Sequence, residues 1–286
     1  MFWIKIKRSE SWLLLAGLFA TALLTTIKLA DNFIDKDGLI LFDQPINLFI
    51  QHLRTPILNK LMLLISLTAN WQMLLWGTLL ASLLLLAAKK RRYLLTMLIS
   101  NTSAWILVEL TKLLTARPRP PVENALIVEH GFAFPSGHSY FAVVFYGLLT
   151  YFWVRHFQKK WEKISILILG SIFILLLAFS RIYLGVHWST DVLAGLSTST
   201  AWLTITIAYI EYKRRFFRQE HQSFNKKLVW QGFGIFMILW LTGLIWLYRN
   251  NINILGKNII KPTTAAVSAI TNTAPAAKSR TNLVAP

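Results

Sequence analysis

The chain has 286 residues, of which 55% are hydrophobic and 15% charged, and its long, nearly uncharged runs predict an all-α, polytopic membrane protein rather than soluble domains. The formal net charge of +18 lies mostly in short loops between apolar runs, where lysine and arginine set membrane orientation, so we expect no nucleic-acid binding. The absence of cysteine excludes disulfides, thiolate zinc sites and a cysteine nucleophile.

Seven apolar runs are long enough to be membrane spans. We expect them at residues 12–30, 72–88, 93–114, 139–154, 164–179, 192–210 and 228–247. The first is expected to be a retained anchor, because Lys28 interrupts the small-residue pattern of a signal-peptide cleavage site. Residues 57–67 are semi-apolar, which predicts an amphipathic helix at the membrane surface.

The end of the chain differs in composition from the rest. Residues 249–286 are rich in Ala, Thr, Asn, Ser and Pro and are predicted to be mostly disordered and outside the cytoplasm. Residues 1–248 then form a single transmembrane domain. No internal repeat or separable soluble domain is evident.

Most basic residues fall in segments on one side of this arrangement. Three precede the first span, four follow the second, four follow the fourth and six follow the sixth. The positive-inside rule therefore places the N-terminus in the cytoplasm and the intervening loops outside. The outer side carries Asp31, Asp35, Asp37 and Asp43, whose spacing is not that of a calcium loop, so we expect solvated loop acids.

Three short polar clusters stand at the edges of apolar runs on the outer side. In the first, Lys112 and Arg119 are separated by six residues, and prolines at 118, 120 and 121 stiffen the exit from the third span. A stiff loop holds the forked guanidinium group of Arg119 in a position to bind phosphate oxygens. The alternative is a snorkelling lysine beside interfacial arginines. Arg117 is expected to touch only a head group or solvent.

The second cluster is Pro135, Ser136, Gly137 and His138, directly before the fourth span. Ser136 is a favourable helix N-cap, and a helix N-terminus attracts anions. Gly137 lets the backbone come close to a ligand, and His138 is placed to give a proton to a leaving oxygen. An ordinary helix cap with an interfacial histidine is the alternative.

The third cluster contains Arg181, His187 and Asp191. If the stretch is helical, His187 and Asp191 share a face and the carboxylate can orient the imidazole for nucleophilic attack. Arg181 adds a second guanidinium group that can bind a phosphate. The alternative is a capped helix with a neighbouring histidine.

Other polar residues have simpler interpretations. The four remaining histidines lie in loops or at interfaces without a partner at a useful spacing: His52, His130, His156 and His221. Glu109 is one turn before Lys112 and is expected to pair with it.

The three clusters, in this order and spacing, resemble the signature of the type 2 phosphatidic acid phosphatase (PAP2) superfamily of membrane lipid phosphatases. The resemblance covers residues 61–210 and implies a six-helix core, so the seventh span lies beyond it. It implies that His187 attacks phosphorus, Asp191 orients His187 and His138 protonates the leaving group. Lys112, Arg119, Ser136, Gly137 and Arg181 are implied to bind the phosphate, with no metal or other cofactor.

The resemblance also implies a lipid phosphate substrate in a bacterial cytoplasmic (inner) membrane, with the site facing the periplasm or outside. Candidates are undecaprenyl pyrophosphate, phosphatidylglycerol phosphate, phosphatidic acid and lipid A phosphate. A phosphotransferase that passes the phosphoryl group to a second lipid would use the same residues. A non-catalytic transporter or lipid-binding scaffold would need charges near span centres, and apart from Glu109 the spans have almost none.

Overall fold

The protein is described from a computed structural model, in which residues 8–31, 38–216 and 226–259 are placed well enough to describe. These residues form helices and no strands, as predicted. The helices are α1 (Arg8–Asp31), α2 (Gly38–His52), α3 (Pro56–Leu67), α4 (Trp71–Ala87), α5 (Arg91–Thr115), α6 (Gly137–Phe141), α7 (Gly147–His156), α8 (Lys160–Tyr183), α9 (Ser189–Phe216) and α10 (Lys226–Ile259). A 3₁₀ turn covers Val122–Asn124, and a π-helical turn, Ala142–Tyr146, joins α6 to α7.

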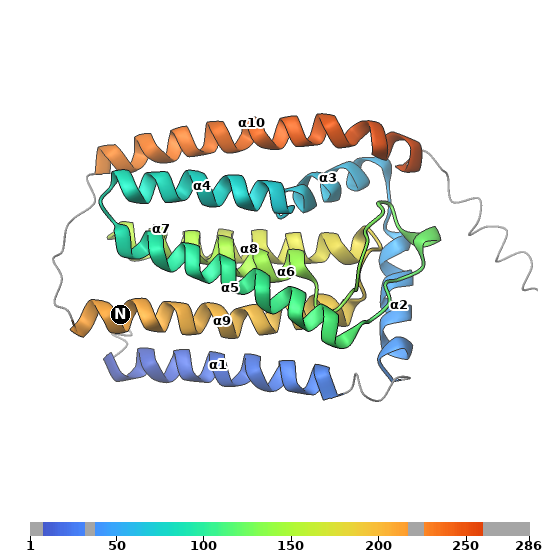
Figure 1. The fold of residues 1–286 in the computed structure, drawn as a ribbon, viewed down its shortest axis with the longest axis horizontal. Helices are drawn as coiled ribbons and strands as arrows, with labels where there is room; N and C mark the ends of the chain where they lie inside the picture. The colour runs from blue at the N-terminus through green and yellow to red at the C-terminus, as the bar shows by residue number, and fades with distance from the viewer. Residues whose placement is uncertain (1–7, 32–37, 217–225, 260–286) are drawn as a thin grey trace, which may run out of the picture.

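Most of these helices run along one direction as a bundle, and α2 crosses one end of it (Figure 1). Four described segments are long and apolar enough to cross a membrane: Arg91–Thr115, Lys160–Tyr183, Ser189–Lys213 and Gln231–Asn250. The pair α3 and α4 also qualifies if its 49° bend is counted within one span. The described residues thus contain four or five candidate spans, and seven spans stay a prediction.

Residues 57–67 lie in α3, which leads into α4 and buries Met62, Leu63 and Leu67 in the bundle. The position of α3 at the membrane surface stays a prediction. The segment before it differs from the sequence-based expectation. Helix α2 replaces part of the expected polar loop. Its buried residues Asp43, Asn47 and Ile50 follow the helical repeat, so this face of α2 packs inward.

The last helix packs on the bundle rather than standing apart. Trp240, Leu244 and Leu247 of α10 share a buried cluster with Leu67 and Met73 of the bent α3–α4 pair. The helix continues to Ile259, so the first part of the expected disordered tail is helical. Residues 260–286, the remainder of that tail, lie outside the described residues.

A close contact between α6 and α9 joins the second and third polar clusters. Gly195 of α9 lies against the start of α6. A Cβ atom added at Gly195 would be 2.7 Å from the Ser136 carbonyl oxygen and 3.1 Å from the Ser139 Cβ. Because backbone on both sides leaves no room to yield, only glycine permits this approach.

Gly195→Ala is therefore predicted to lower stability by about 1–3 kcal/mol, because it overpacks this contact. Thermal unfolding of the purified protein in detergent measures the effect. Gly234→Ala in α10 is the matched control, because an added Cβ there meets nothing within 4 Å. An unchanged melting temperature for Gly195→Ala would contradict the packing described here.

Candidate active site

The three polar clusters meet at the end of the bundle that α2 crosses. Backbone hydrogen bonds tie the connecting segments together. The Ala133 N–H donates to the Arg117 carbonyl at 2.9 Å, and the Ser136 N–H donates to the Asp191 carbonyl at 3.0 Å. The polar side chains of the three clusters are thereby held at one site although they are far apart in sequence.

Helix α5 ends in a way that sends two arginines toward this site. Its C-cap, Ala116, has a φ of 47°, in the left-handed region that terminates helices. The prolines that follow prevent the helix from resuming. The chain therefore turns back, with Arg117 and Arg119 both directed into the protein.

His187 lies in the turn between α8 and α9, not in a helix. The prediction that it would share a helical face with Asp191 was conditional on a helix, and the pairing arises differently. Asp191 is in the first turn of α9, and its Oδ2 lies 3.5 Å from His187 Nδ1. The same oxygen accepts a 2.9 Å hydrogen bond from the Trp188 N–H. Asp191 thus caps α9 and faces the imidazole at once.

Burial lowers the pKa of His187 from its ordinary value, with Asp191 opposing the shift. The imidazole is 1% exposed. A lowered pKa keeps the ring neutral at neutral pH, which is the form that can act as a nucleophile.

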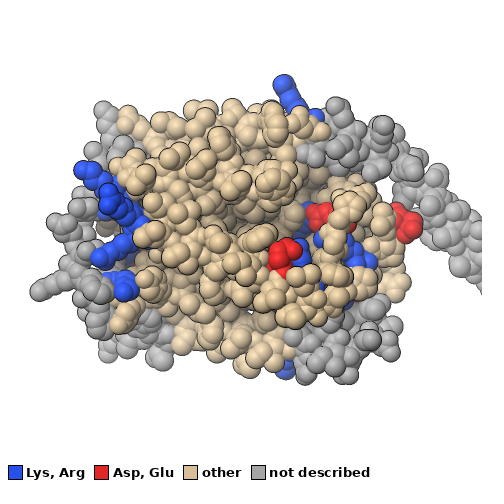
Figure 2. All heavy atoms as spheres, viewed as in Figure 1, with Lys and Arg blue, Asp and Glu red and all other residues tan. Residues whose placement is uncertain are grey.

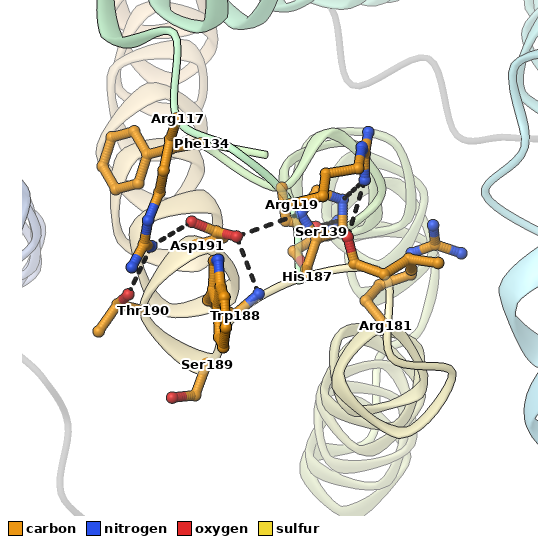
Figure 3. A network of polar contacts seen from close by, with 12 residues as sticks. Arg117, Arg119, Phe134, Ser139, Arg181, His187, Trp188, Ser189, Thr190 and Asp191 are labelled. Atoms are coloured by element: carbon orange, nitrogen blue, oxygen red, sulfur yellow. Dashed lines mark hydrogen bonds and ion pairs between the residues drawn. The ribbon is translucent and has the colours of Figure 1, made fainter. Parts of the chain in front are cut away.

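The expectation that Arg117 would face a head group or solvent is wrong, because it is buried between two carboxylates. Its Nη2 donates to Asp43 Oδ2 at 2.7 Å, and its Nη1 donates to Asp191 (the Asp191 contact is drawn in Figure 3). Asp43 is correspondingly not a solvated loop acid. It is fully buried and accepts the Thr190 N–H at 2.9 Å and the Ser189 hydroxyl. Asp35 and Asp37 lie outside the described residues.

Arg119 binds several acceptors around His187. Its Nη1 is 3.2 Å from His187 Nε2 and donates to the Val186 carbonyl at 2.8 Å. Its Nε and Nη2 donate to the Gly131 and His130 carbonyls. The guanidinium therefore lies directly beside the ring nitrogen that faces away from Asp191. His130 is exposed and lies in a loop, one of the two positions expected for it.

Arg181 enters the site from the end of α8 and is 1% exposed. Its Nη1 donates to the Ser66 hydroxyl of α3, and its Nη2 contacts Glu129. Figure 3 shows Arg119, Arg181 and His187 grouped on one side of the network, with Arg117 and Thr190 on the other.

Glu129 is the one acid among these cations that sequence analysis did not identify. Its carboxylate pairs with Arg181 and, at 3.1 Å, with Arg119. It lies 4.0 Å from a ring nitrogen of both His138 and His187. Burial by itself would raise the pKa of Glu129, but the surrounding positive groups outweigh it and lower the pKa well below its ordinary value. The only sequence signal was an acid near the second cluster.

Lys112 and the start of α6 complete the site. The Lys112 Nζ would be 3.7 Å from a Cβ added at Gly137, and it pairs with Glu109 at 3.1 Å, as predicted. Ser136 is the expected N-cap of α6, with its buried hydroxyl bonded to Ser139. The Ser136 hydroxyl thus caps the N-terminus of α6 by accepting the Ser139 N–H. Within the described residues, no group of three or more His, Cys, Asp or Glu side chains could hold a metal ion.

A bundle of apolar helices with a buried site of arginines, histidines and carboxylates at one end defines an integral membrane protein with an anion site. A sequence model of the PAP2 superfamily matches residues 89–215, which contain all three clusters. This segment is therefore similar to the PAP2 superfamily, as the cluster spacing predicted.

Named relatives agree with this similarity. The chain is 41% identical over 93 residues to phosphatidylglycerophosphatase B of Bacillus subtilis, over 32% of this chain and 45% of that protein. It is 33% identical over 122 residues to undecaprenyl-diphosphatase of Sulfolobus acidocaldarius, over 41% of this chain and 54% of that protein. The chain thus spans about half the length of the curated relatives it matches.

A solved structure extends the similarity beyond the matched segment. The crystal structure of a transmembrane PAP2-type phosphatidylglycerolphosphate phosphatase from Bacillus subtilis superposes with a TM-score of 0.62 and 28% sequence identity. The alignment covers 71% of this chain and 98% of that chain. This likeness and the apolar helices together identify a multi-pass membrane protein.

Asp43→Ala is predicted to lower stability by about 3–5 kcal/mol, because it leaves the buried Arg117 charge with one carboxylate instead of two. Thermal unfolding in detergent measures the effect. Glu123→Ala, at an exposed acid, is the control, and Asp43→Asn should lose less because the amide oxygen still accepts the Thr190 N–H. Equal melting temperatures for Asp43→Ala and Glu123→Ala would contradict this assignment.

Proposed function

We propose that this protein is a lipid phosphatase that cleaves a phosphate ester or pyrophosphate through a phosphohistidine at His187. The observation that carries the proposal is the position of Arg119. Its guanidinium lies 3.2 Å from His187 Nε2 and also pairs with an anionic group, the Glu129 carboxylate. The Arg119 guanidinium thus contacts both an anion and the neutral Nε2 of His187. A nucleophilic attack on phosphate requires this arrangement, with the anion and the nucleophile at one cation.

Each step of the proposed reaction uses a group at this site. Arg119, Arg181 and Lys112 bind the phosphate oxygens, and the backbone at Gly137 approaches them. His187 Nε2 attacks phosphorus, and the bond to the leaving oxygen breaks as His138 donates a proton to that oxygen. Water then attacks the phosphohistidine and releases inorganic phosphate.

In this proposal, arginine and lysine side chains stabilise the transferred phosphoryl group, as a metal ion does in many phosphoryl transfers. The developing negative charge on the transferred group is spread over its oxygens, and preorganised arginine and lysine donors stabilise it without having to reorganise. Asp191 orients His187, because its carboxylate faces Nδ1 and holds the imidazole in one tautomer. The negative charge of Asp191 is balanced by its ion pair with Arg117.

The distribution of charge supports a site at the outer face of the membrane. A group of lysines and arginines lies at one end of the molecule, and the acidic residues visible in this view lie toward the other end, beside further basic side chains (Figure 2). The turn between α4 and α5, the start of α8 and the end of α9 lie at the end of the bundle opposite α2 (Figure 1), and these segments carry Lys90, Arg92, Lys160 and Lys213. By the positive-inside rule that end faces the cytoplasm, so the site opens toward the periplasm or the outside.

The substrate we propose is a lipid phosphate presented from the outer leaflet. The names of the two relatives direct the choice to phosphatidylglycerol phosphate and undecaprenyl pyrophosphate, with phosphatidic acid and lipid A phosphate as further candidates. A lipid phosphotransferase would share every step up to the phosphohistidine. Free phosphate identifies hydrolysis, and a newly phosphorylated lipid identifies transfer.

The purified full chain is predicted to release phosphate from at least one of these lipids in detergent containing EDTA. His187→Gln should lower the rate by at least about 10³-fold, because it removes the nucleophile. His52→Gln, at an exposed histidine outside the site, is the control and should keep the wild-type rate. A fully active His187→Gln protein would rule out the proposed mechanism, and loss of release in EDTA would rule out metal independence.

A further inference from the structure

The contacts of Glu129 coincide with those that a substrate phosphate needs. One carboxylate oxygen pairs with Arg181, and the other lies 3.1 Å from Arg119. The two histidines with proposed chemical roles each have a ring nitrogen 4.0 Å from this carboxylate. Glu129 therefore occupies the place where the proposed reaction puts the phosphoryl group.

From these contacts we propose that Glu129 is an internal competitor for the phosphate site, which lipid phosphate displaces on binding and which returns to expel inorganic phosphate. The proposal rests on the proposed function. A carboxylate and a phosphate cannot contact the same faces of Arg119 and Arg181 together, so one excludes the other. A phosphate offers more oxygens and, as a dianion, more charge than the carboxylate, which favours the exchange.

The side chain of Glu129 has room for such a displacement. Both neighbours, Val128 and His130, are exposed, and so are Gly131 and Phe132. Gly131 has a φ of +78°, and a Cβ added there would meet nothing within 4 Å. The outer side of this segment is therefore unobstructed, and Glu129 can swing out without repacking the core.

The same segment is tied to Arg119 through its backbone. The Arg119 guanidinium donates to the Gly131 carbonyl at 3.0 Å and to the His130 carbonyl at 3.2 Å. Departure of Glu129 leaves these two bonds in place. The arginine therefore stays fixed while the anion it binds is exchanged.

Competition from a tethered carboxylate has a defined thermodynamic consequence. The apparent affinity for any phosphate is reduced by the fraction of molecules in which Glu129 is in the site. A small product such as inorganic phosphate gains nothing from lipid contacts, so this reduction favours its release. A lipid phosphate also gains binding energy from its chains and is retained.

The experiment compares inorganic phosphate as a ligand for wild type, Glu129→Gln and Glu123→Gln. Two readouts are used: the inhibition constant of phosphate in the lipid phosphatase assay, and the phosphate-induced rise in melting temperature, which needs no turnover. Glu129→Gln should bind phosphate at least about tenfold more tightly, because a neutral amide competes poorly for two arginines. Glu123→Gln removes an exposed acid from the preceding 3₁₀ turn and should match wild type.

Unchanged or weaker phosphate binding by Glu129→Gln in both readouts would overturn the proposal. A large fall in kcat with an unchanged inhibition constant would also overturn it and identify Glu129 as a catalytic group instead. If Glu129→Gln does not fold, Glu129→Ala is used with the same criteria. The proposed function is tested independently, and it is wrong if wild type releases no phosphate from any lipid. In that case the melting-temperature readout still tests the exchange of Glu129 for phosphate.

Discussion

The arrangement of the site depends on the burial of one arginine between two aspartates. Arg117 is 5% exposed, and its partners Asp43 and Asp191 are fully buried. A buried charge without a partner costs several kcal/mol, so the three groups are stable only together. Because they belong to the segment after α5, to α2 and to α9, this single contact fixes three parts of the chain relative to one another.

The chemistry that we propose follows from that constraint. Asp191 is held by Arg117 on one side and faces His187 on the other, so the imidazole has one orientation. Asp43 accepts the Thr190 N–H in the first turn of α9 and so extends the support to the start of that helix. His187 Nε2 is then directed at Arg119, which also pairs with the Glu129 carboxylate. The helices provide a rigid frame, and the connecting segments carry His187, Arg119 and Glu129.

The sequence predicted the helical class and brought the three clusters together through their spacing and their positions at span ends. It did not predict α2, because Pro45 in its middle argues against a helix and Asp43 was interpreted as part of a polar loop. Without α2, neither the buried state of Asp43 nor that of Arg117 could be inferred. Glu129 was missed because it lies in an irregular segment, where no periodicity indicates which side chains point inward.

The central claim is that His187 forms the covalent intermediate, and trapping that intermediate tests it most directly. The purified protein would be mixed with a lipid phosphate substrate, quenched rapidly in alkaline detergent, in which phosphohistidine survives, and digested for mass spectrometry. The account predicts a phosphoryl group on the peptide that contains His187 and none in the His187→Gln variant. Phosphate on another residue, or turnover by the variant, would contradict it.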